Sequence, residues 1–251
     1  MSDAIYWSAS RIAREIRAAK LTSRQIVEAC LERIEQVNPA INAVVQLVAG
    51  RALGEADALD RMAAGEQFKG PLHGVPITIK DSLDTEGIVT TGGTLGRRDF
   101  VPAQDAPVVA RLRAAGAVLL GKTNTPELTF SGETNNLIYG RSCNPYDLAR
   151  SPGGSSGGSA AIVACGGSAL ELGSDTGGSI REPAHLCGIA GIKPTSGRTP
   201  RSGHIVPYGG VLDCLTQIGP MARYVEDLSI ALPLICGPDG RDPAVVPVSM
   251  N

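Results

Sequence analysis

Apolar residues recur at helical spacing along the first 70 residues of the chain. The sequence Thr22-Ser23-Arg24-Gln25 has the form of a capping box, which predicts that a helix begins there. Apolar side chains then fall on one face of this helix, at Ile26, Val27, Cys30, Leu31, Ile34 and Val37. We expect the helix to end at Asn38-Pro39, because the helical conformation is disfavoured before proline. Shorter patterns predict a helix around residues 12–19, a strand at 43–48 and a helix at 51–64.

From residue 74 onward, short apolar runs alternate with helical patterns. The apolar runs predict strands at residues 75–79, 117–120 and 169–172, and the periodic segments predict helices at residues 108–115, 159–165 and 225–235. This alternation predicts an α/β protein with a largely parallel sheet. The sequence shows no internal repeat and no clear linker, so we interpret residues 1–251 as a single domain. Its parts are an N-terminal helical segment (1–70), a core segment (71–237) and an irregular tail (238–251).

Composition narrows the class of protein. Hydrophobic residues make up 43% of the chain and charged residues 19%, which is typical of an ordered globular protein. The 23 basic and 25 acidic residues exclude a generic polycation, and aromatic residues are only 4%, so we expect no direct nucleic-acid binding. No C-x-x-C motif and no cluster of metal ligands is present, so we expect no metal and no cofactor. The N-terminus lacks a signal sequence and no apolar run is long enough to span a membrane, which predicts a cytoplasmic protein.

Two segments rich in glycine and serine, residues 151–159 and 173–181, are the densest chemical signal. Free N–H groups in such turns form anion sites, but no lysine follows either segment as a phosphate-binding loop requires. The dinucleotide-binding fingerprint is not cleanly met either. A Gly-x-Ser-x-Gly elbow fits at Ser155 and at Ser156, with Asp175 and then His185 or His204 downstream as partners. A purely structural tight turn is the remaining interpretation.

Lys80 ends an apolar strand run and is one of only five lysines. Burial disfavours the ammonium form, lowers the pKa of a lysine and makes it a candidate general base. The alternative is a lysine whose head reaches solvent or an acidic partner.

Several motifs together resemble the amidase signature family. They are Gly-Val-Pro-Ile-Thr-Ile-Lys-Asp ending at residue 81, Gly-Gly-Ser-Ser-Gly-Gly-Ser at 153–159, and Asp-Thr-Gly-Gly-Ser-Ile-Arg at 175–181. Segments 121–124, 188–195 and 217–220 resemble the family as well. The resemblance extends from about Ser8 to Gly237. It implies an amidase-signature-type fold, in which helices flank a central mixed, mostly parallel sheet. The family's chains are much longer, so the fold is expected to lack its C-terminal half here.

The resemblance also implies a catalytic triad in the core segment. Lys80 would be the base, Ser155 the bridging serine joined to Gly154 by a cis peptide bond, and Ser179 the nucleophile. The backbone N–H groups that would form an oxyanion hole are those of Thr176, Gly177, Gly178 and Ser179. Ser156 would be a supporting hydroxyl beside the triad, and Asp175 and Arg181 would support the turn rather than react.

The function implied by the resemblance is hydrolysis of a carboxamide C–N bond in a small-molecule substrate, through an acyl-enzyme and without a cofactor. One alternative is the glutaminase subunit of a glutamyl-tRNA(Gln) amidotransferase. Another is an inactive, truncated fragment that acts only in binding or assembly. A Ser-His-Asp hydrolase that uses Ser156 is a third. Because truncation would expose sheet edges and apolar surface, we expect self-association or a partner chain that supplies the missing half.

Overall fold

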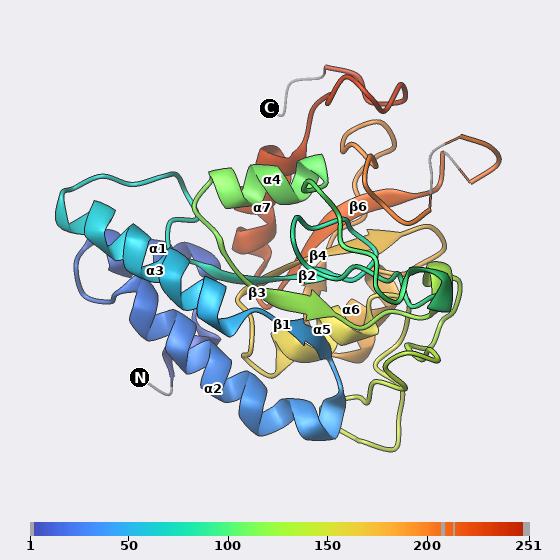
Figure 1. Cartoon of the computed structure of the whole chain (residues 1–251), viewed down its shortest axis with the longest axis horizontal. Coiled ribbons are helices and arrows are strands. Elements are labelled where there is room, and N and C mark those ends of the chain that lie inside the picture. Colours follow the sequence, from blue (N-terminus) through green and yellow to red (C-terminus); the bar gives the residue numbers. More distant parts are fainter. Residues whose placement is uncertain (1–2, 207–208, 213, 248–251) are drawn as a thin grey trace.

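The computed structural model describes residues 3–206, 209–212 and 214–247, and in this part of the chain a six-stranded sheet forms the centre (Figure 1). The strands are β1 (Val44–Leu47), β2 (Pro76–Lys80), β3 (Val118–Thr123), β4 (Leu170–Asp175), β5 (Ala190–Gly191) and β6 (Gln217–Ala222). Their order across the sheet is β1-β3-β2-β4-β6-β5. This arrangement confirms the α/β fold class and the mixed sheet.

The expectation that most of the sheet is parallel is wrong. Strand β2 is parallel to β3 and to β4, but the pairs β1–β3, β4–β6 and β5–β6 are antiparallel. Parallel pairing is therefore limited to the central three strands. An apolar run indicates that a strand is buried but not which way it points, so the direction of the flanking strands could not be predicted from such runs.

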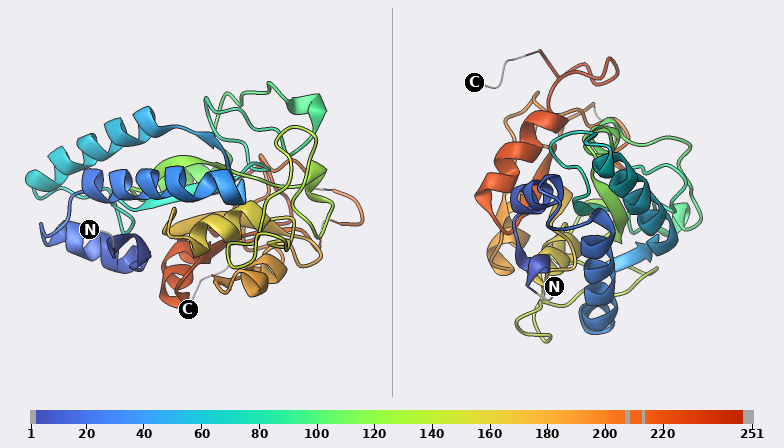
Figure 2. Two further views of the ribbon diagram at one scale, coloured as in Figure 1. Left: turned by 90° about the horizontal axis from the view of Figure 1, so that it is seen from below. Right: turned by 90° about the vertical axis from the view of Figure 1, so that its left-hand side faces the viewer.

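Seven α-helices surround the sheet within the described residues. They are α1 (Ala9–Arg17), α2 (Ser23–Ile41), α3 (Ala49–Ala64), α4 (Pro107–Ala114), α5 (Gly157–Ala164), α6 (Arg181–Leu186) and α7 (Val225–Ile235). Short 3-10 turns lie at Ala4–Tyr6, Leu95–Arg97 and Glu127–Thr129. Figure 2 shows α3 on one side of the sheet and α5 and α6 on the other. No helix of the described residues is long and apolar enough to cross a membrane.

Helix α2 begins where the sequence predicts and ends later than expected. Thr22 and Gln25 form the capping box through both hydrogen bonds. The helix continues past Pro39 to Ile41 and ends at Asn42, whose φ of 45° is left-handed. The Asn38 side chain accepts the N–H groups of the two residues that follow Asn42, at 2.8 Å each. These contacts hold the last turn in place, so the prediction of a helix end at Asn38-Pro39 is wrong.

Most other predicted elements are present, and three short ones were not predicted. Strand β6 contains Gly219 and Pro220, which weaken the β pattern, yet it pairs with β4 along its whole length. Helix α6 contains Pro183, and β5 is only two residues long. Of the predicted tail, residues 238–247 contain no helix or strand, and residues 248–251 lie outside the described part.

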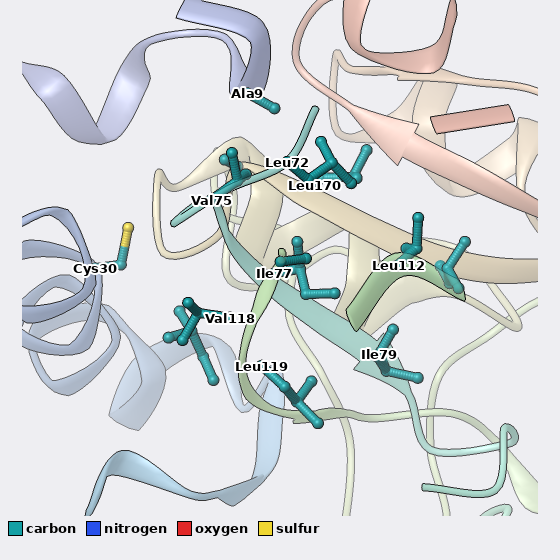
Figure 3. Close-up of a cluster of buried hydrophobic side chains, with 14 of the residues drawn as sticks. Ala9, Cys30, Leu72, Val75, Ile77, Ile79, Leu112, Val118, Leu119 and Leu170 are labelled. Carbon is teal, nitrogen blue, oxygen red and sulfur yellow. The ribbon is translucent and has the colours of Figure 1, made fainter. Parts of the chain in front are cut away.

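The apolar core lies against one face of the central strands. Ile77 and Ile79 of β2 pack with Leu119 of β3 and Leu112 of α4, and all four side chains are fully buried (Figure 3). Side chains alternate along a strand, so Thr78 and Lys80 point to the opposite face of β2. The register of β2 thus places one apolar face in the core and directs Lys80 into a polar environment.

Helix α5 approaches the sheet so closely that a side chain does not fit at Gly158. A Cβ there would lie 2.6 Å from the Asn124 nitrogen and 2.7 Å from the Ala43 oxygen, both of which are backbone atoms. We expect Gly158→Ala to lower the free energy of unfolding by about 1–3 kcal/mol, measured by urea denaturation. The matched control is Gly54→Ala in α3, where nothing lies within 4 Å of the added Cβ. That substitution should raise the stability by up to about 1 kcal/mol, and equal effects at both sites would contradict the close approach of α5.

Candidate active site

Lys80 lies at the carboxyl end of β2 and is completely buried. Its Nζ atom is 2.7 Å from Ser155 Oγ and 3.0 Å from Ser174 Oγ. Burial lowers the pKa of the Lys80 ammonium to about 7, although the carboxylates of Asp175 and Glu171 oppose this effect. A substantial fraction of Lys80 is therefore a neutral amine near neutral pH.

Ser155 lies in the loop that leads into α5, and its side chain is fully buried. The peptide bond between Gly154 and Ser155 is cis, as the resemblance implies. A Cβ on Gly154 would lie 2.5 Å from the Ser131 carbonyl oxygen, so only glycine fits at this position. The loop is thus held closely between β2 and the segment around Ser131.

Ser179 lies in the turn between β4 and α6 and is half-buried. Its carbonyl oxygen accepts the N–H of Ser156 at 3.2 Å, which joins this turn directly to the residue after Ser155. The Ser179 hydroxyl makes no hydrogen bond with the described part of the chain. The structure therefore brings the segments of Lys80, Ser155 and Ser179 together at one end of the central strands.

Asp175 and Arg181 fix the shape of this turn. The fully buried Asp175 carboxylate receives two hydrogen bonds from the Arg181 guanidinium, at 2.9 and 3.0 Å, and lies 3.5 Å from Lys193 Nζ. It also accepts the backbone N–H groups of Gly178, Ile180 and Arg181. Burial alone would raise the pKa of Asp175, but Arg181 and these N–H groups lower it to about 2. Asp175 is thus ionised and supports the turn.

One of the four predicted oxyanion donors is already in use. The Gly178 N–H donates to Asp175 Oδ1 at 2.9 Å, because the turn folds back onto the end of β4. The prediction of a free donor at Gly178 is therefore wrong. The N–H groups of Thr176, Gly177 and Ser179 donate to no group among the described residues. Nothing lies within 4 Å of a Cβ built on Gly177, so this part of the turn is open to a ligand.

The geometry does not support a Ser-His-Asp arrangement around Ser156. The Ser156 hydroxyl donates to the Ser174 carbonyl at 3.3 Å, and no histidine of the described residues hydrogen-bonds to Ser156 or Asp175. His185 is exposed on α6. His204 is buried and accepts the Val206 N–H through Nδ1 at 3.1 Å. The elbow-type hydrolase considered from the sequence is therefore wrong for this chain.

Sequence reasoning missed three side chains that complete the site. Ser174 hydrogen-bonds to Lys80, Lys193 donates to the Thr176 carbonyl at 2.9 Å, and the hydroxyls of Thr216 and Thr176 are 2.8 Å apart. Ser174 directly precedes Asp175 in the glycine-rich motif, and Lys193 lies in the Gly-Ile-Lys-Pro run. Both motifs are evident in the sequence, but nothing in them shows that these side chains hydrogen-bond to Lys80 and to Thr176.

The fold and the site together define the class of protein. The family model described as Amidase matches residues 25–250, so the chain belongs to the amidase family. The chain is 52% identical, over 229 residues, to a glutamyl-tRNA(Gln) amidotransferase subunit of Nitratidesulfovibrio vulgaris (strain DP4). That alignment covers 91% of this chain and 45% of the relative.

Solved structures show the same fold at lower identity. The peptide amidase from Stenotrophomonas maltophilia superposes with a TM-score of 0.90 at 36% identity, over 97% of this chain and 51% of that one. A protein from a vestigial complex, described as revealing the evolutionary origins of an s-triazine catabolic enzyme, gives a TM-score of 0.92 at 39% identity. That match covers 98% of this chain and 53% of the other. The chain thus spans about half the length of the relatives that it matches.

Proposed function

We propose that this protein hydrolyses carboxamide C–N bonds of small molecules through an acyl-enzyme on Ser179. The observation that carries the proposal is the buried Lys80 Nζ, 2.7 Å from the hydroxyl of Ser155, whose neighbour Ser156 is hydrogen-bonded to Ser179. A serine hydroxyl becomes an effective nucleophile only when a base takes its proton. A lysine with a pKa of about 7 is suited to that role near neutral pH.

The proton moves along the three side chains. Ser179 Oγ attacks the amide carbon while its proton passes to Ser155 Oγ, and the Ser155 proton passes to Lys80 Nζ. The oxyanion that forms accepts hydrogen bonds from the free N–H groups of Thr176, Gly177 and Ser179. One such donor contributes roughly 3–4 kcal/mol of transition-state stabilisation. The relay then runs in reverse and protonates the leaving amine as the C–N bond breaks. Water hydrolyses the ester, releasing the acid and restoring Ser179.

A second candidate function is supported by the 52% identity to a glutamyl-tRNA(Gln) amidotransferase subunit. In that case the amide is the side chain of glutamine, and the ammonia passes to a partner protein. The same residues would perform the chemistry. We include in the proposal a cytoplasmic location, no direct contact with nucleic acid, and either self-association or a partner chain that completes the domain.

The test is covalent capture of the wild-type chain with a fluorophosphonate probe, followed by intact mass and peptide mapping. We expect a single adduct on Ser179. Glutamine turnover and a panel of simple amides would then separate the two candidate functions. An adduct on Ser156 would contradict the mechanism. No adduct on folded protein would favour a fragment that acts only in binding or assembly, or one that needs a partner chain.

A further inference from the structure

A second buried acid, Glu171 of β4, lies next to the site and takes no part in the proposed relay. Its side chain is fully buried. The Oε2 atom accepts the Thr78 hydroxyl, and Oε1 is 3.1 Å from Thr123 Oγ1 and 3.2 Å from Ser159 Oγ. These three hydroxyls come from β2, β3 and α5. Glu171 therefore connects the strand that carries Lys80 to the helix that follows Ser155.

The strand register places Lys80 beside this network. Thr78 precedes Lys80 by two residues, so both side chains lie on the same face of β2. Thr78 is paired in register with Glu171 of β4, and Lys80 with Thr123 of β3. The Glu171 carboxyl and the Lys80 amine are thus neighbours on one side of the sheet, and both are shielded from solvent. In such surroundings charges interact strongly and are little screened by salt.

The hydrogen bonds around Glu171 accommodate both of its protonation states. Thr123 and Ser159 are also 2.8 Å from each other, so the network has four contacts. The three hydroxyl protons are all satisfied when the carboxylate is ionised. A carboxyl proton supplies the fourth hydrogen bond when it is neutral. Glu171 can therefore change its charge without leaving a buried polar atom unpaired.

The other charged groups around Lys80 have partners of their own, although Asp175 also raises the pKa of Lys80. Asp175, the other buried acid of β4, is paired with Arg181 and Lys193. His204, from the loop that pairs with Leu83, has its pKa lowered to about 3 by burial, and is neutral. Lys122 of β3 lowers the pKa of Glu171, but it donates to Leu83, Thr85 and Thr90 and forms no ion pair with Glu171 in the described structure. Within the described residues, Glu171 is the buried carboxyl near Lys80 that has only hydroxyl partners.

We propose that Glu171 is a positioning residue whose carboxylate is a buried counter-charge of the Lys80 ammonium, in addition to Asp175. This inference rests on the proposed function, in which Lys80 gains a proton in each half-reaction. The ammonium that forms is stabilised by a negative charge nearby in the protein interior, and Glu171 supplies one. Because Glu171 is hydrogen-bonded to hydroxyl groups and not to Lys80, it leaves the Lys80 amine in contact with Ser155. Burial raises the pKa of Glu171 and lowers that of Lys80, and each charge offsets the burial penalty of the other, so a proton on Lys80 favours the carboxylate form of Glu171.

The test measures the charge of Lys80 directly. The chain has only five lysines, so a lysine-selective NMR titration of the labelled protein resolves them, with Lys80→Met assigning the signal. Glu171→Gln keeps the shape of the side chain but removes its charge. We expect it to lower the titration midpoint of Lys80 by about one pH unit, because an ammonium without a nearby carboxylate is less stable. Glu182→Gln, an exposed acid three residues after Ser179, is the matched control and should leave the midpoint unchanged.

A second variant, Ser159→Ala, tests the role of Glu171 if Glu171→Gln does not fold. Ser159→Ala removes one hydroxyl that stabilises the carboxylate, and should move the Lys80 midpoint in the same direction by a smaller amount. An unchanged midpoint in the folded variants would overturn the proposal and leave Glu171 as a structural hydrogen-bonding group. The titration does not require activity. A shift without Ser179 capture would therefore count against the proposed function and not against the role of Glu171.

Discussion

Replacing Lys80 with methionine is expected to lower the rate of Ser179 acylation by roughly three orders of magnitude, within the range that general acid–base catalysis contributes. Methionine fills a similar volume but cannot accept a proton, so Ser155 loses the group that makes it a base toward Ser179. The measurement is the second-order rate constant for fluorophosphonate capture, followed by intact mass. A rate within a few-fold of the wild type would rule out Lys80 as the base.

The pH dependence of the wild-type rate provides an independent check on Lys80. Its pKa is lowered to about 7, so the neutral amine predominates above this pH and the rate should reach a plateau there. Below it the ammonium predominates and the rate should fall about tenfold for each pH unit. Lys122→Met is the matched control, because Lys122 is also fully buried but contacts Leu83, Thr85 and Thr90 instead of Ser155. The capture rate of this variant should still fall below about pH 7, as it does in the wild type.

The stability of Lys80→Met separates loss of chemistry from loss of folding. Between about pH 7 and 10.5 the unfolded chain binds a proton on Lys80 that the folded chain does not. The stability of the wild type therefore falls as the pH decreases through this range, and methionine removes that effect. We expect the inactive variant to resist urea better than the wild type at pH 7. Lower stability together with lower activity would point instead to a damaged fold.

The strands that carry much of the site could be predicted from the sequence, because their apolar residues form clear patterns. Continuous apolar runs locate β2, β3 and β4, and the position of Lys80 at the end of such a run predicts its burial. The polar contacts that tune Lys80 could not be predicted in the same way. Glu171 and Ser174 occupy strand positions where a polar residue ordinarily faces solvent. Only the packed structure shows that both side chains are buried.

The turn at residues 176–180 shows a second limit of sequence reasoning. The motif identifies a glycine-rich turn after a strand, but it does not show which of the four successive N–H groups are free to bind a ligand. Gly178 has a φ of 136°, and its N–H points back to Asp175. Which donors remain free depends on the backbone torsions of the turn, and these follow from the contacts of Asp175 with Arg181 and Lys193.

Two adjacent serines give the sharpest test of the relay. Ser155→Ala is expected to lower the capture rate by roughly 10²–10³-fold, because the Ser155 hydroxyl contacts Lys80 and belongs to the loop that is hydrogen-bonded to the Ser179 turn. Ser156→Ala should lower it by less than about tenfold, since that hydroxyl contacts only the Ser174 carbonyl, at 3.3 Å. Both serines are fully buried and one residue apart, so they are closely matched for any effect on packing.

The double variant Lys80→Met/Ser155→Ala tests whether the two residues act as one unit. If the proton passes from Ser179 through Ser155 to Lys80, removing either residue breaks the same path. The double variant should then react no more than a few-fold more slowly than Lys80→Met alone. Multiplicative losses would instead mean that Lys80 and Ser155 assist Ser179 independently, and the relay would have to be abandoned. A greater loss in Ser156→Ala than in Ser155→Ala would mean that the bridging role is assigned to the wrong serine, although Ser156 has no contact with Lys80 among the described residues.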